Sequence, residues 1–556
     1  MRRCEVEMTA AAVNASEWAR GWRRTVQVSA LASRVGAARR RALATSLFVA
    51  TMMAVSLGGA TAVTAQVAPA PPTLSENGVI DLDLELMVEL ALNSSYRVRQ
   101  LNLGIDRTQL RLRSQRARLR SSIDLDLSAP DYRSITESRW NSDLGREELI
   151  HEDSRRLEAE LSVRQPVILF GYPTNGYLSL NNRIYRYTQV DEAGESDLRY
   201  YNRAFVSYTQ PLFQPNELKN DLEEAELDLE DAELGFYDDV VEIIEDVSGD
   251  YFDLFEEAYG AVINESHVAN LTVAEDAATA LAEADPSRAI ELGQIRVELA
   301  NAREQLQQAR SDFRLEATSL KTRLNVPETD SIALDPVIDI RPVAIDAESA
   351  TTFALELTPR MRQLDISYRE NEINLDQTRG RGGVQIDVRL TYGREMQDPI
   401  FQQMWGDPTN TYTIDVNGRI PIWDWGERKY RIQAAEVGLR QTDLRREEVE
   451  NQIRASVQSE VRNVTEYQSR ALAMEENLEL ARDLSEESLE RYAEGSLAGV
   501  DLLQTRRRGA DTAENLLDAY LGWRQAITRL QEMTFYDFER GVPVLERFGI
   551  GIPNAT

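Results

Sequence analysis

The longest feature of the chain is a helical pattern of apolar positions. From Asn216 to about Glu283 there is no proline, and apolar side chains recur every three or four residues. The recurring positions are Leu218, Leu222, Ala225, Leu229, Ala232, Phe236, Val240, Ile243, Val247, Tyr251, Leu254 and Ala258. Their period is close to 3.6, which predicts a nearly straight helix of roughly 100 Å. Because a helix in a protein gains most of its stability from packing, this one must pack against others.

Other stretches carry the same helical period. Asp285-Pro286-Ser287 end the first long helix, and the glycine-containing segment near residue 495 ends a second one. Each long helix is followed by a return helix, so the chain predicts two helical hairpins with tips near 285 and 495. The further helices expected are Leu82–Leu119, Ile290–Leu324, about Ala350–Arg379, about Arg428–Ala493 and about Val500–Met533.

Between the helices the period changes from 3.6 to 2. Residues 384–394 and 410–420 alternate apolar and polar side chains, as does the shorter run from Ile123 to Leu127. An additional hairpin is expected at about 134–190. Runs of about ten residues with one apolar face have the length of tilted membrane strands. A half-buried strand of a soluble sheet shows the same alternation, so the pattern alone leaves both interpretations open.

The chain is one unit used twice. Ile290-Glu291-Leu292-Gly293-Gln294-Ile295-Arg296 matches Val500-Asp501-Leu502-Leu503-Gln504-Thr505-Arg506, and Gln210-Pro211-Leu212-Phe213 matches Ile420-Pro421-Ile422-Trp423 at the same offset of 210 residues. Such self-similarity indicates two structural repeats. The first repeat carries 53 extra residues before its Gln-Pro, which is where the additional hairpin is expected.

These patterns predict the domain organisation. Residues 1–65 have the features of a signal peptide with an extended N-terminal region, because Arg39-Arg40-Arg41 precede a short apolar run that ends in small residues. The remaining parts are a first repeat (66–325), a junction (326–349), a second repeat (350–540) and a C-terminal tail (541–556).

Charge and chemistry narrow the function. The net charge is −31, and loss of residues 1–65, with nine Arg and three Glu, would leave −37. This argues against nucleic acid and anionic membrane surfaces as partners, and a solvated acidic surface is the simpler explanation of the charge. Cys4 is the only cysteine, and His151 and His267 are the only histidines. We therefore expect no metal site, no cofactor and no catalytic centre; carboxylates are plentiful, but no pair stands out.

Several of these segments resemble one family. They are Leu90-Ala91-Leu92-Asn93, Gln210-Pro211-Leu212-Phe213, Ile420-Pro421-Ile422-Trp423-Asp424-Trp425-Gly426, Arg491-Tyr492-Ala493-Glu494-Gly495 and Val500-Asp501-Leu502-Leu503. In this order, with the repeat and the signal peptide, the chain resembles the TolC family of outer-membrane efflux proteins. The resemblance implies an α+β membrane protein: a homotrimer that forms a transmembrane β-barrel continued by a long α-helical periplasmic tunnel, with two structural repeats per protomer.

The resemblance also implies a function. It is a passive exit duct in the outer membrane, serving a tripartite efflux pump or a type I secretion system. A periplasmic adaptor protein would dock at the helical tips and connect the duct to an inner-membrane pump or transporter. The alternative is a periplasmic coiled-coil scaffold without channel activity. A carboxylate-type enzyme is a third possibility and lacks a recognisable centre.

Candidate site residues follow from the same resemblance. Asp501 stands where the family carries an acidic residue at the tunnel mouth, and Gln504 where a second acid is frequent. Glu291 is the counterpart of Asp501 in the first repeat. Tyr492 and Arg506 are expected to help close this tunnel gate. For Asp501 the alternative is an N-cap of the return helix.

The tips themselves are the expected adaptor contacts. Gly495, Ser496 and Leu497 match the contact segment of the family in the second tip, although a glycine there also serves simply to break the helix. The first tip departs from the pattern, because Asp285 and Pro286 replace the usual glycine and apolar residue.

Overall fold

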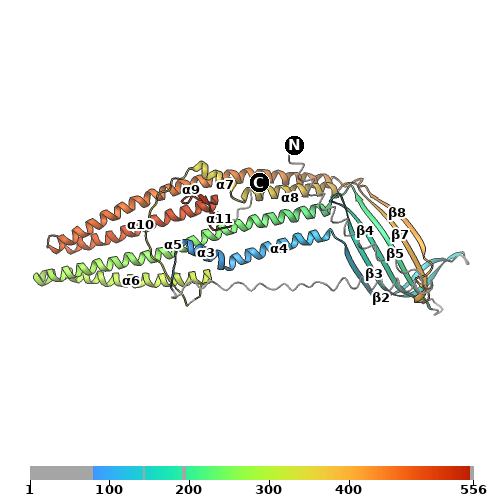
Figure 1. Cartoon of the computed structure of the whole chain (residues 1–556), viewed down its shortest axis with the longest axis horizontal. Coiled ribbons are helices and arrows are strands. Elements are labelled where there is room, and N and C mark those ends of the chain that lie inside the picture. Colours follow the sequence, from blue (N-terminus) through green and yellow to red (C-terminus); the bar gives the residue numbers. More distant parts are fainter. Residues whose placement is uncertain (1–78, 142–144, 191–195, 328, 551–556) are drawn as a thin grey trace, which may run out of the picture. The chain divides into compact units, whose positions relative to one another are not determined.

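The fold is described from a computed structural model, which covers residues 79–141, 145–190, 196–327 and 329–550. The signal peptide expected at 1–65 lies outside these residues. The described part contains long helices and one large sheet (Figure 1). No helix among the described residues combines the length and the apolar character that crossing a membrane requires.

The two repeats follow the same plan. The first consists of α3 (Leu84–Ser94), α4 (Tyr96–Arg118), β2 (Ser122–Asn141), β3 (Arg146–Leu169), β4 (Tyr172–Val190), β5 (Ser196–Leu212), α5 (Glu217–Ala284), the short 3-10 helix η1 (Pro286–Arg288) and α6 (Ala289–Leu324). The second consists of α7 (Ala347–Glu356), α8 (Arg360–Arg381), β7 (Gln385–Asp398), η2 (Phe401–Gln403), β8 (Thr409–Arg419), α9 (Glu427–Ala493) and α10 (Gly499–Thr534).

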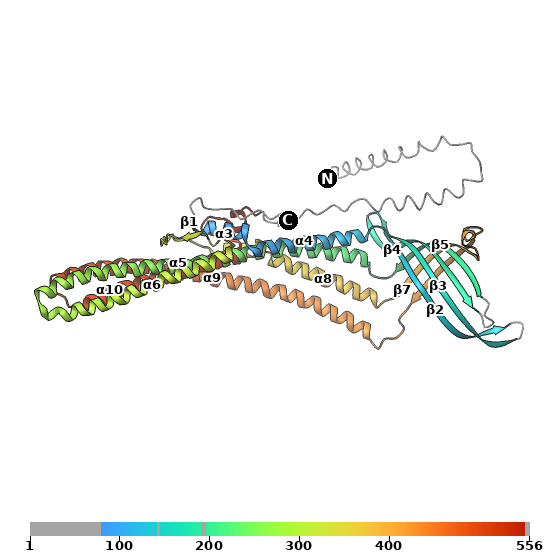
Figure 2. The same cartoon turned by 90° about the horizontal axis from the view of Figure 1, so that it is seen from below.

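The long helices begin and end where the sequence gives local reasons. Asn216 caps α5, because its side-chain oxygen accepts a hydrogen bond from the backbone N–H of Lys219 at 3.1 Å. Pro286 follows α5 and begins η1. Helices α5 and α9 contain 68 and 67 residues, so each is roughly 100 Å long. Both hairpin tips therefore lie far from the sheet, at the opposite ends of these helices (Figures 1 and 2).

The sheet is antiparallel with the strand order β2-β3-β4-β5-β7-β8. The additional hairpin of the first repeat provides β3 and β4, which lie inside the sheet between β2 and β5. The first repeat thus contributes four strands and the second two. The strands range from 11 to 24 residues, so most are longer than the ten residues that the alternation predicted.

Two helices expected to be continuous are each divided, so this part of the prediction was wrong. The segment Leu82–Leu119 is split into α3 and α4 at Ser95, whose hydroxyl accepts from the N–H of Val98 at 3.3 Å and caps the second helix. The segment Ala350–Arg379 is split into α7 and α8 before Pro359, whose ring disfavours helical backbone in the preceding residue. The breaks occupy equivalent positions in the two repeats.

Small elements connect the halves. In the junction, β6 (Ser331–Ala333) pairs in parallel with β1 (Val79–Asp81). After α10 the chain forms the strands β9 (Tyr536–Asp537) and β10 (Val542–Pro543) and the short helix α11 (Val544–Arg547). The buried carboxylate of Asp537 accepts hydrogen bonds from the backbone N–H groups of Glu539 and Arg540 and pairs with Arg547 at 3.0 Å. These bonds hold the C-terminal turn together.

The main core lies among the helices. Helices α5 and α6 pack against each other, as do α9 and α10, while α4 runs along α5 and α8 along α9. Helix α10 also packs against α5, which joins the two hairpins. Trp523 of α10 is fully buried at this junction, in a cluster with Phe252 and Phe255 of α5. The core that joins the repeats is therefore built from residues distant in sequence.

Close approach of α9 and α10 depends on Gly522. A Cβ atom at this position would lie 2.9 Å from the ring of Tyr467, a distance that forces the ring to move. We expect Gly522→Ala to lower the free energy of unfolding by about 1–2 kcal/mol, because overpacking outweighs the better helix propensity of alanine. Thermal unfolding of the detergent-extracted protein, followed by near-UV circular dichroism, measures this change.

Gly438 of α9 provides the matched control. No atom lies within 4 Å of a Cβ placed there, so Gly438→Ala should leave the melting temperature unchanged or raise it. If both substitutions shift the melting temperature equally, the proposed contact between Gly522 and Tyr467 is not what limits packing.

Candidate functional sites: the amphipathic sheet and the helical tips

The sheet has one apolar and one polar face, and the strand register shows this directly. One row of directly paired residues crosses all six strands and is apolar throughout: Ile123, Val163, Leu180, Val206, Tyr392 and Tyr412. The neighbouring row, whose side chains point to the other face, is polar throughout: Ser122, Arg164, Ser179, Ser207, Thr391 and Thr413. Successive side chains along a strand point to opposite faces, so the alternation is in phase across the whole sheet.

No other described part of the chain covers the apolar face. Large apolar side chains of β2, β4, β7 and β8 are exposed on it, among them Leu125, Leu180 and Ile414. The polar face carries ion pairs between strands: Arg183 pairs with Glu158 at 2.8 Å, and Arg203 pairs with Glu395 at 2.6 Å. An uncovered apolar face of this extent marks a surface for lipid or for another protein.

Aromatic side chains lie at the end of the sheet that adjoins the helices. Phe170 occupies the turn between β3 and β4, Phe213 follows β5, and Trp423 and Trp425 follow β8. All four are largely exposed, and Trp425 retains 86% of its accessible surface. Exposed aromatic residues at the rim of an apolar band are typical of strands that meet a membrane–water interface.

The second tip is a tight helix end. Gly495 adopts a positive φ of 80°, its N–H donates to the carbonyl of Tyr492 at 2.8 Å, and the N–H of Ser496 donates to the carbonyl of Arg491 at 2.9 Å. This pair of bonds is a Schellman motif, which satisfies carbonyls at the end of α9 and favours glycine at the left-handed position. Ser496 is exposed, whereas Leu497 is half-buried and packs against the apolar cluster beneath the tip.

The first tip is closed by a different device. Asp285 caps η1, because its Oδ1 accepts from the N–H of Ser287 at 3.0 Å. Hydrogen bonding from the Ser287 side chain, and then from its backbone N–H, lowers the pKa of the Asp285 carboxyl. Pro286 follows at the first position of η1, where its missing N–H costs nothing. Both side chains are exposed.

The two tips contact each other. The Arg288 guanidinium donates to the carbonyl of Gly495 at 3.0 Å, and the Tyr492 hydroxyl donates to the Glu291 carboxylate at 3.4 Å. The Tyr492 ring is completely buried against Ile295 of α6 and its neighbours. Burial and the charge of Glu291 raise the Tyr492 pKa, so the hydroxyl keeps its proton and remains a donor at neutral pH. Tyr492 and Glu291 are therefore brought together as one contact between the tips.

The remaining gate candidates occupy different positions. Asp501 and Gln504 are exposed on the first turns of α10. The alternative of an N-cap role for Asp501 was wrong, because the N-cap is Ala498 and Asp501 lies three residues further on. In the first turn of α10, the negative charge of Asp501 still interacts favourably with the positive end of the helix dipole. Arg506 is buried, and its guanidinium donates to Ser485 of α9 at 2.9 Å, so it links the helices of one hairpin rather than the two tips.

Sequence reasoning missed three tip residues. Nothing in the sequence indicated that Arg288 would contact Gly495, since the two residues are 207 positions apart. Ile290 and Val500 are exposed apolar side chains at equivalent positions of the two tips, with 74% and 59% of their surface accessible. The internal repeat showed that the two positions are equivalent. It did not show that their side chains are exposed, because an apolar residue in a helical pattern is normally expected to be buried. Among the described residues, no cluster of His, Cys, Asp or Glu is arranged to hold a metal ion.

Comparisons with known proteins point to outer-membrane channels. Residues 353–534 match the sequence model of the outer membrane efflux protein family, named OEP. No curated protein sequence matches the chain. Among the solved structures that share the fold are CusC, in a study of folding and transmembrane channel formation, the outer-membrane channel OprN, and the outer membrane protein VceC from Vibrio cholerae.

The structural likeness covers most of each chain. For CusC the TM-score is 0.58 at 13% identity, covering 85% of this chain and 93% of that one. For OprN the TM-score is 0.58 at 13% identity, covering 81% of this chain and 89% of that one. For VceC the TM-score is 0.56 at 12% identity, covering 84% of this chain and 97% of that one. At such low identity these structures establish the fold alone.

Together the comparisons confirm the resemblance and the α+β channel fold predicted from the sequence, and the proteins that they match are outer-membrane proteins, in line with the predicted location. The family and these structures are described as outer-membrane or channel proteins, and none of them as an enzyme. Residues 353–534 therefore match the outer membrane efflux protein family, within a chain that shares the fold of solved outer-membrane channels over more than four fifths of its length.

Proposed function

We propose that this protein is the passive exit duct of a tripartite efflux pump or a type I secretion system. Three copies form the duct, and a periplasmic adaptor protein docks at the helical tips and connects it to an inner-membrane pump or transporter. The observation that carries the proposal is the uncovered sheet with one apolar and one polar face. Lipid contacts the apolar face, and the polar face lines an aqueous pore.

The open edges of the sheet support assembly. Among the described strands, β2 pairs only with β3 and β8 only with β7, so each has one row of backbone groups without a partner in this chain. In lipid such groups find no water, so an open sheet does not span a bilayer and must close with other copies. Six strands per copy give 18 strands in a trimer. Without β3 and β4 the total would be 12.

The additional hairpin therefore increases the width of the proposed pore. Barrel diameter grows roughly in proportion to the strand number, so 18 strands enclose a pore about one and a half times as wide as 12. Barrels of 16–18 strands leave an aqueous channel. The helical part carries no corresponding insertion in the first repeat, since α5 and α9 differ by one residue in length. The hairpin thus widens the membrane part of the duct without lengthening the helical hairpins.

The scaffold alternative is disfavoured by the same sheet. A water-soluble scaffold would expose the apolar row and the aromatic rim to solvent, which soluble proteins rarely do over such an area. The tips also have a surface suited to docking of an adaptor protein. Ile290 and Val500 present apolar side chains beside the exposed Asp285, Pro286 and Ser496, which is a small apolar surface with a polar surround.

Edge pairing between copies is testable by disulfide cross-linking. Cys4, the only cysteine, lies in the expected signal segment, so introduced cysteines have no competitor in the mature chain. Leu125→Cys in β2, combined in turn with Tyr412→Cys, Ile414→Cys or Val416→Cys in β8, should give covalent trimers in at least one combination. Non-reducing gel electrophoresis of membranes detects them. Three partners are needed because one copy does not fix the register between β2 and β8.

The control pair is Leu125→Cys with Leu180→Cys. Leu180 lies on β4, in the interior of the sheet, and should form no bond between copies. If every β2–β8 combination remains monomeric under oxidation while the control behaves identically, the two edges do not meet and the proposed closure is wrong.

Conduction tests the duct and the gate together. The mature protein, extracted in detergent and placed in a planar bilayer, should give discrete current steps that favour cations. Asp501→Asn should raise the half-blocking concentration of a trivalent cation at least about fivefold, since one charge pair at about 4 Å in water contributes about 1 kcal/mol. Three exposed carboxylates around one axis would focus such cations.

Glu494→Gln removes an exposed carboxylate from the same tip and should leave the block nearly unchanged. Equal block in wild type and Asp501→Asn removes Asp501 from the gate. A protein that stays in solution without detergent and never conducts contradicts the duct itself and favours the scaffold.

Docking is best tested at Val500. Leu497 is a less clean probe, because it packs against the tip cluster and Leu497→Glu would also disturb the fold of the tip. Val500→Glu places a charge on the exposed apolar surface and should reduce export at least about tenfold while the trimer stays intact, because a buried unpaired charge at an interface is strongly unfavourable. Val500→Ile keeps the surface apolar and should export normally. Normal export by Val500→Glu would place the adaptor elsewhere.

A further inference from the structure

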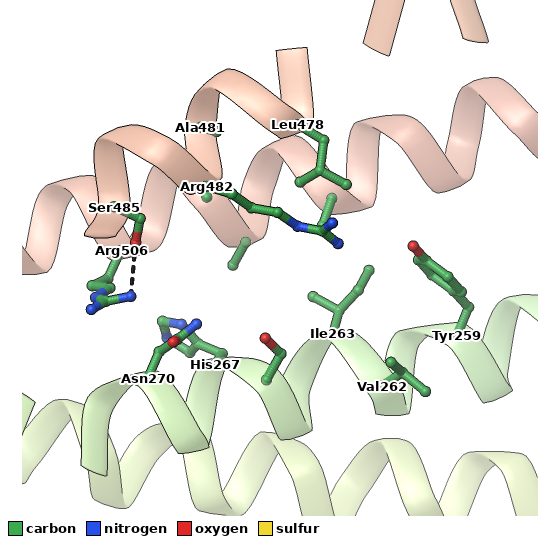
Figure 3. A pocket seen from close by; sticks show the side chains of 14 residues that line it. Tyr259, Val262, Ile263, His267, Asn270, Leu478, Ala481, Arg482, Ser485 and Arg506 are labelled. Atoms are coloured by element: carbon green, nitrogen blue, oxygen red, sulfur yellow. Dashed lines mark hydrogen bonds between the residues drawn. The ribbon is translucent and has the colours of Figure 1, made fainter. Parts of the chain in front are cut away.

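A cavity lies behind the tips, where α5 faces both α9 and α10 (Figure 3). Its volume is about 110 Å³. A single water molecule needs about 10–15 Å³ on this measure, so the cavity is large enough for a small polyatomic ion with accompanying water. It lies five residues beyond Asp501 along α10 and is separate from the tip contacts described above.

The polar lining of the cavity is cationic. Arg506 and Arg482 extend into it from α10 and α9, and His267 and Asn270 extend from α5 on the opposite side (Figure 3). No Asp or Glu is among the described residues that line it. The chain as a whole has 93 acidic and 62 basic residues, so a lining with two arginines and no carboxylate runs against its composition.

Arg506 is the buried member of this lining. It retains 6% of its accessible surface, its Nη1 donates to Ser485 at 2.9 Å, and its Nε is buried without a hydrogen-bond partner. No ion pair of Arg506 is formed within the described part of the chain. Burial lowers the Arg506 pKa, with the charge of Glu486 acting in the opposite direction. A buried guanidinium that lacks an anionic partner is unfavourable, and a bound anion removes this cost.

We propose that this cavity binds a small oxyanion of the phosphate or sulfate class. The planar guanidinium of Arg506 offers two parallel N–H donors to its oxygens, which is the geometry that oxyanions prefer. Arg482 supplies a second positive charge, and Asn270 supplies an amide donor from α5. The bound ion therefore bridges the first hairpin to the second. Burial lowers the His267 pKa, so the ring contributes as a neutral donor rather than as a third charge.

The test is the thermal stability of the purified full-length mature protein in detergent, titrated with sodium phosphate at constant ionic strength. Wild type should show a saturable rise in melting temperature, because a ligand that binds only the folded state stabilises it. Arg506→Met should weaken phosphate binding at least about tenfold, since it removes charge-assisted hydrogen bonds. In phosphate-free buffer the same variant should melt at the wild-type temperature or higher, because an apolar side chain replaces a buried unpaired charge.

Arg507→Met is the matched control. Arg507 is the next residue on α10, is exposed and does not line the cavity, so this variant should keep the full phosphate response. Arg482→Met should show a smaller loss than Arg506→Met, because Arg482 is exposed.

Three results would overturn the proposal. They are no saturable response in wild type, an unchanged response in Arg506→Met, or an equal loss in Arg507→Met. If Arg506→Met instead lowers the trimer mass in light scattering and wild type ignores phosphate, a carboxylate of a second copy fills the cavity and no free ion is bound. The readout does not depend on conduction, so the outcome is independent of the proposed function.

Discussion

The constraint on which this structure depends is the hydrogen bonding of the sheet edges. A strand buried in lipid has no water to satisfy its N–H and C=O groups, so a membrane sheet must have no free edge. The six strands of this chain leave one edge of β2 and one of β8 without a partner among the described residues. Self-association removes both edges at once. The apolar row from Ile123 to Tyr412 also calls for a partner or for lipid, because no other part of the described chain covers it.

The long helices of the two repeats are stabilised by packing against other helices. Each of α5 and α9 gains most of its stability from packing of its apolar positions, and each is packed against a return helix and a shorter helix from the sheet side. The two hairpins are joined where Trp523 meets Phe252 and Phe255. Side-chain size controls this packing, since Gly522 admits the ring of Tyr467 and a methyl group would not. The core therefore secures the middle of the helices, while the tips depend on a small cluster of their own.

Much of the architecture was predictable because it rests on periodicity. The 3.6-residue period located α5 and α9 to within a residue or two, and the period of 2 located β7 and β8. The breaks at Ser95 and before Pro359 were missed, because a local cap or a proline effect leaves the apolar period intact. The alternation in β3 and β4 was visible, but their place inside the sheet was not, since strand order depends on pairing between distant segments. The contact between Arg288 and Gly495 was missed for the same reason.

The tip contacts are weak enough for the opening that the proposed duct requires. Each bond has one charged partner, the guanidinium of Arg288 or the carboxylate of Glu291, and the bond from Tyr492 to Glu291 is long at 3.4 Å, so each contributes on the order of 1–2 kcal/mol. The Tyr492 ring contributes more, because its complete burial stabilises the closed tips by roughly 1.5–3 kcal/mol. Separation of the tips thus costs a few kcal/mol. A partner that binds the separated tips better by that amount is sufficient to shift the population. The proposed duct would then need no other source of energy at its mouth. Tips joined by a core as large as the one around Trp523 would not separate without unfolding.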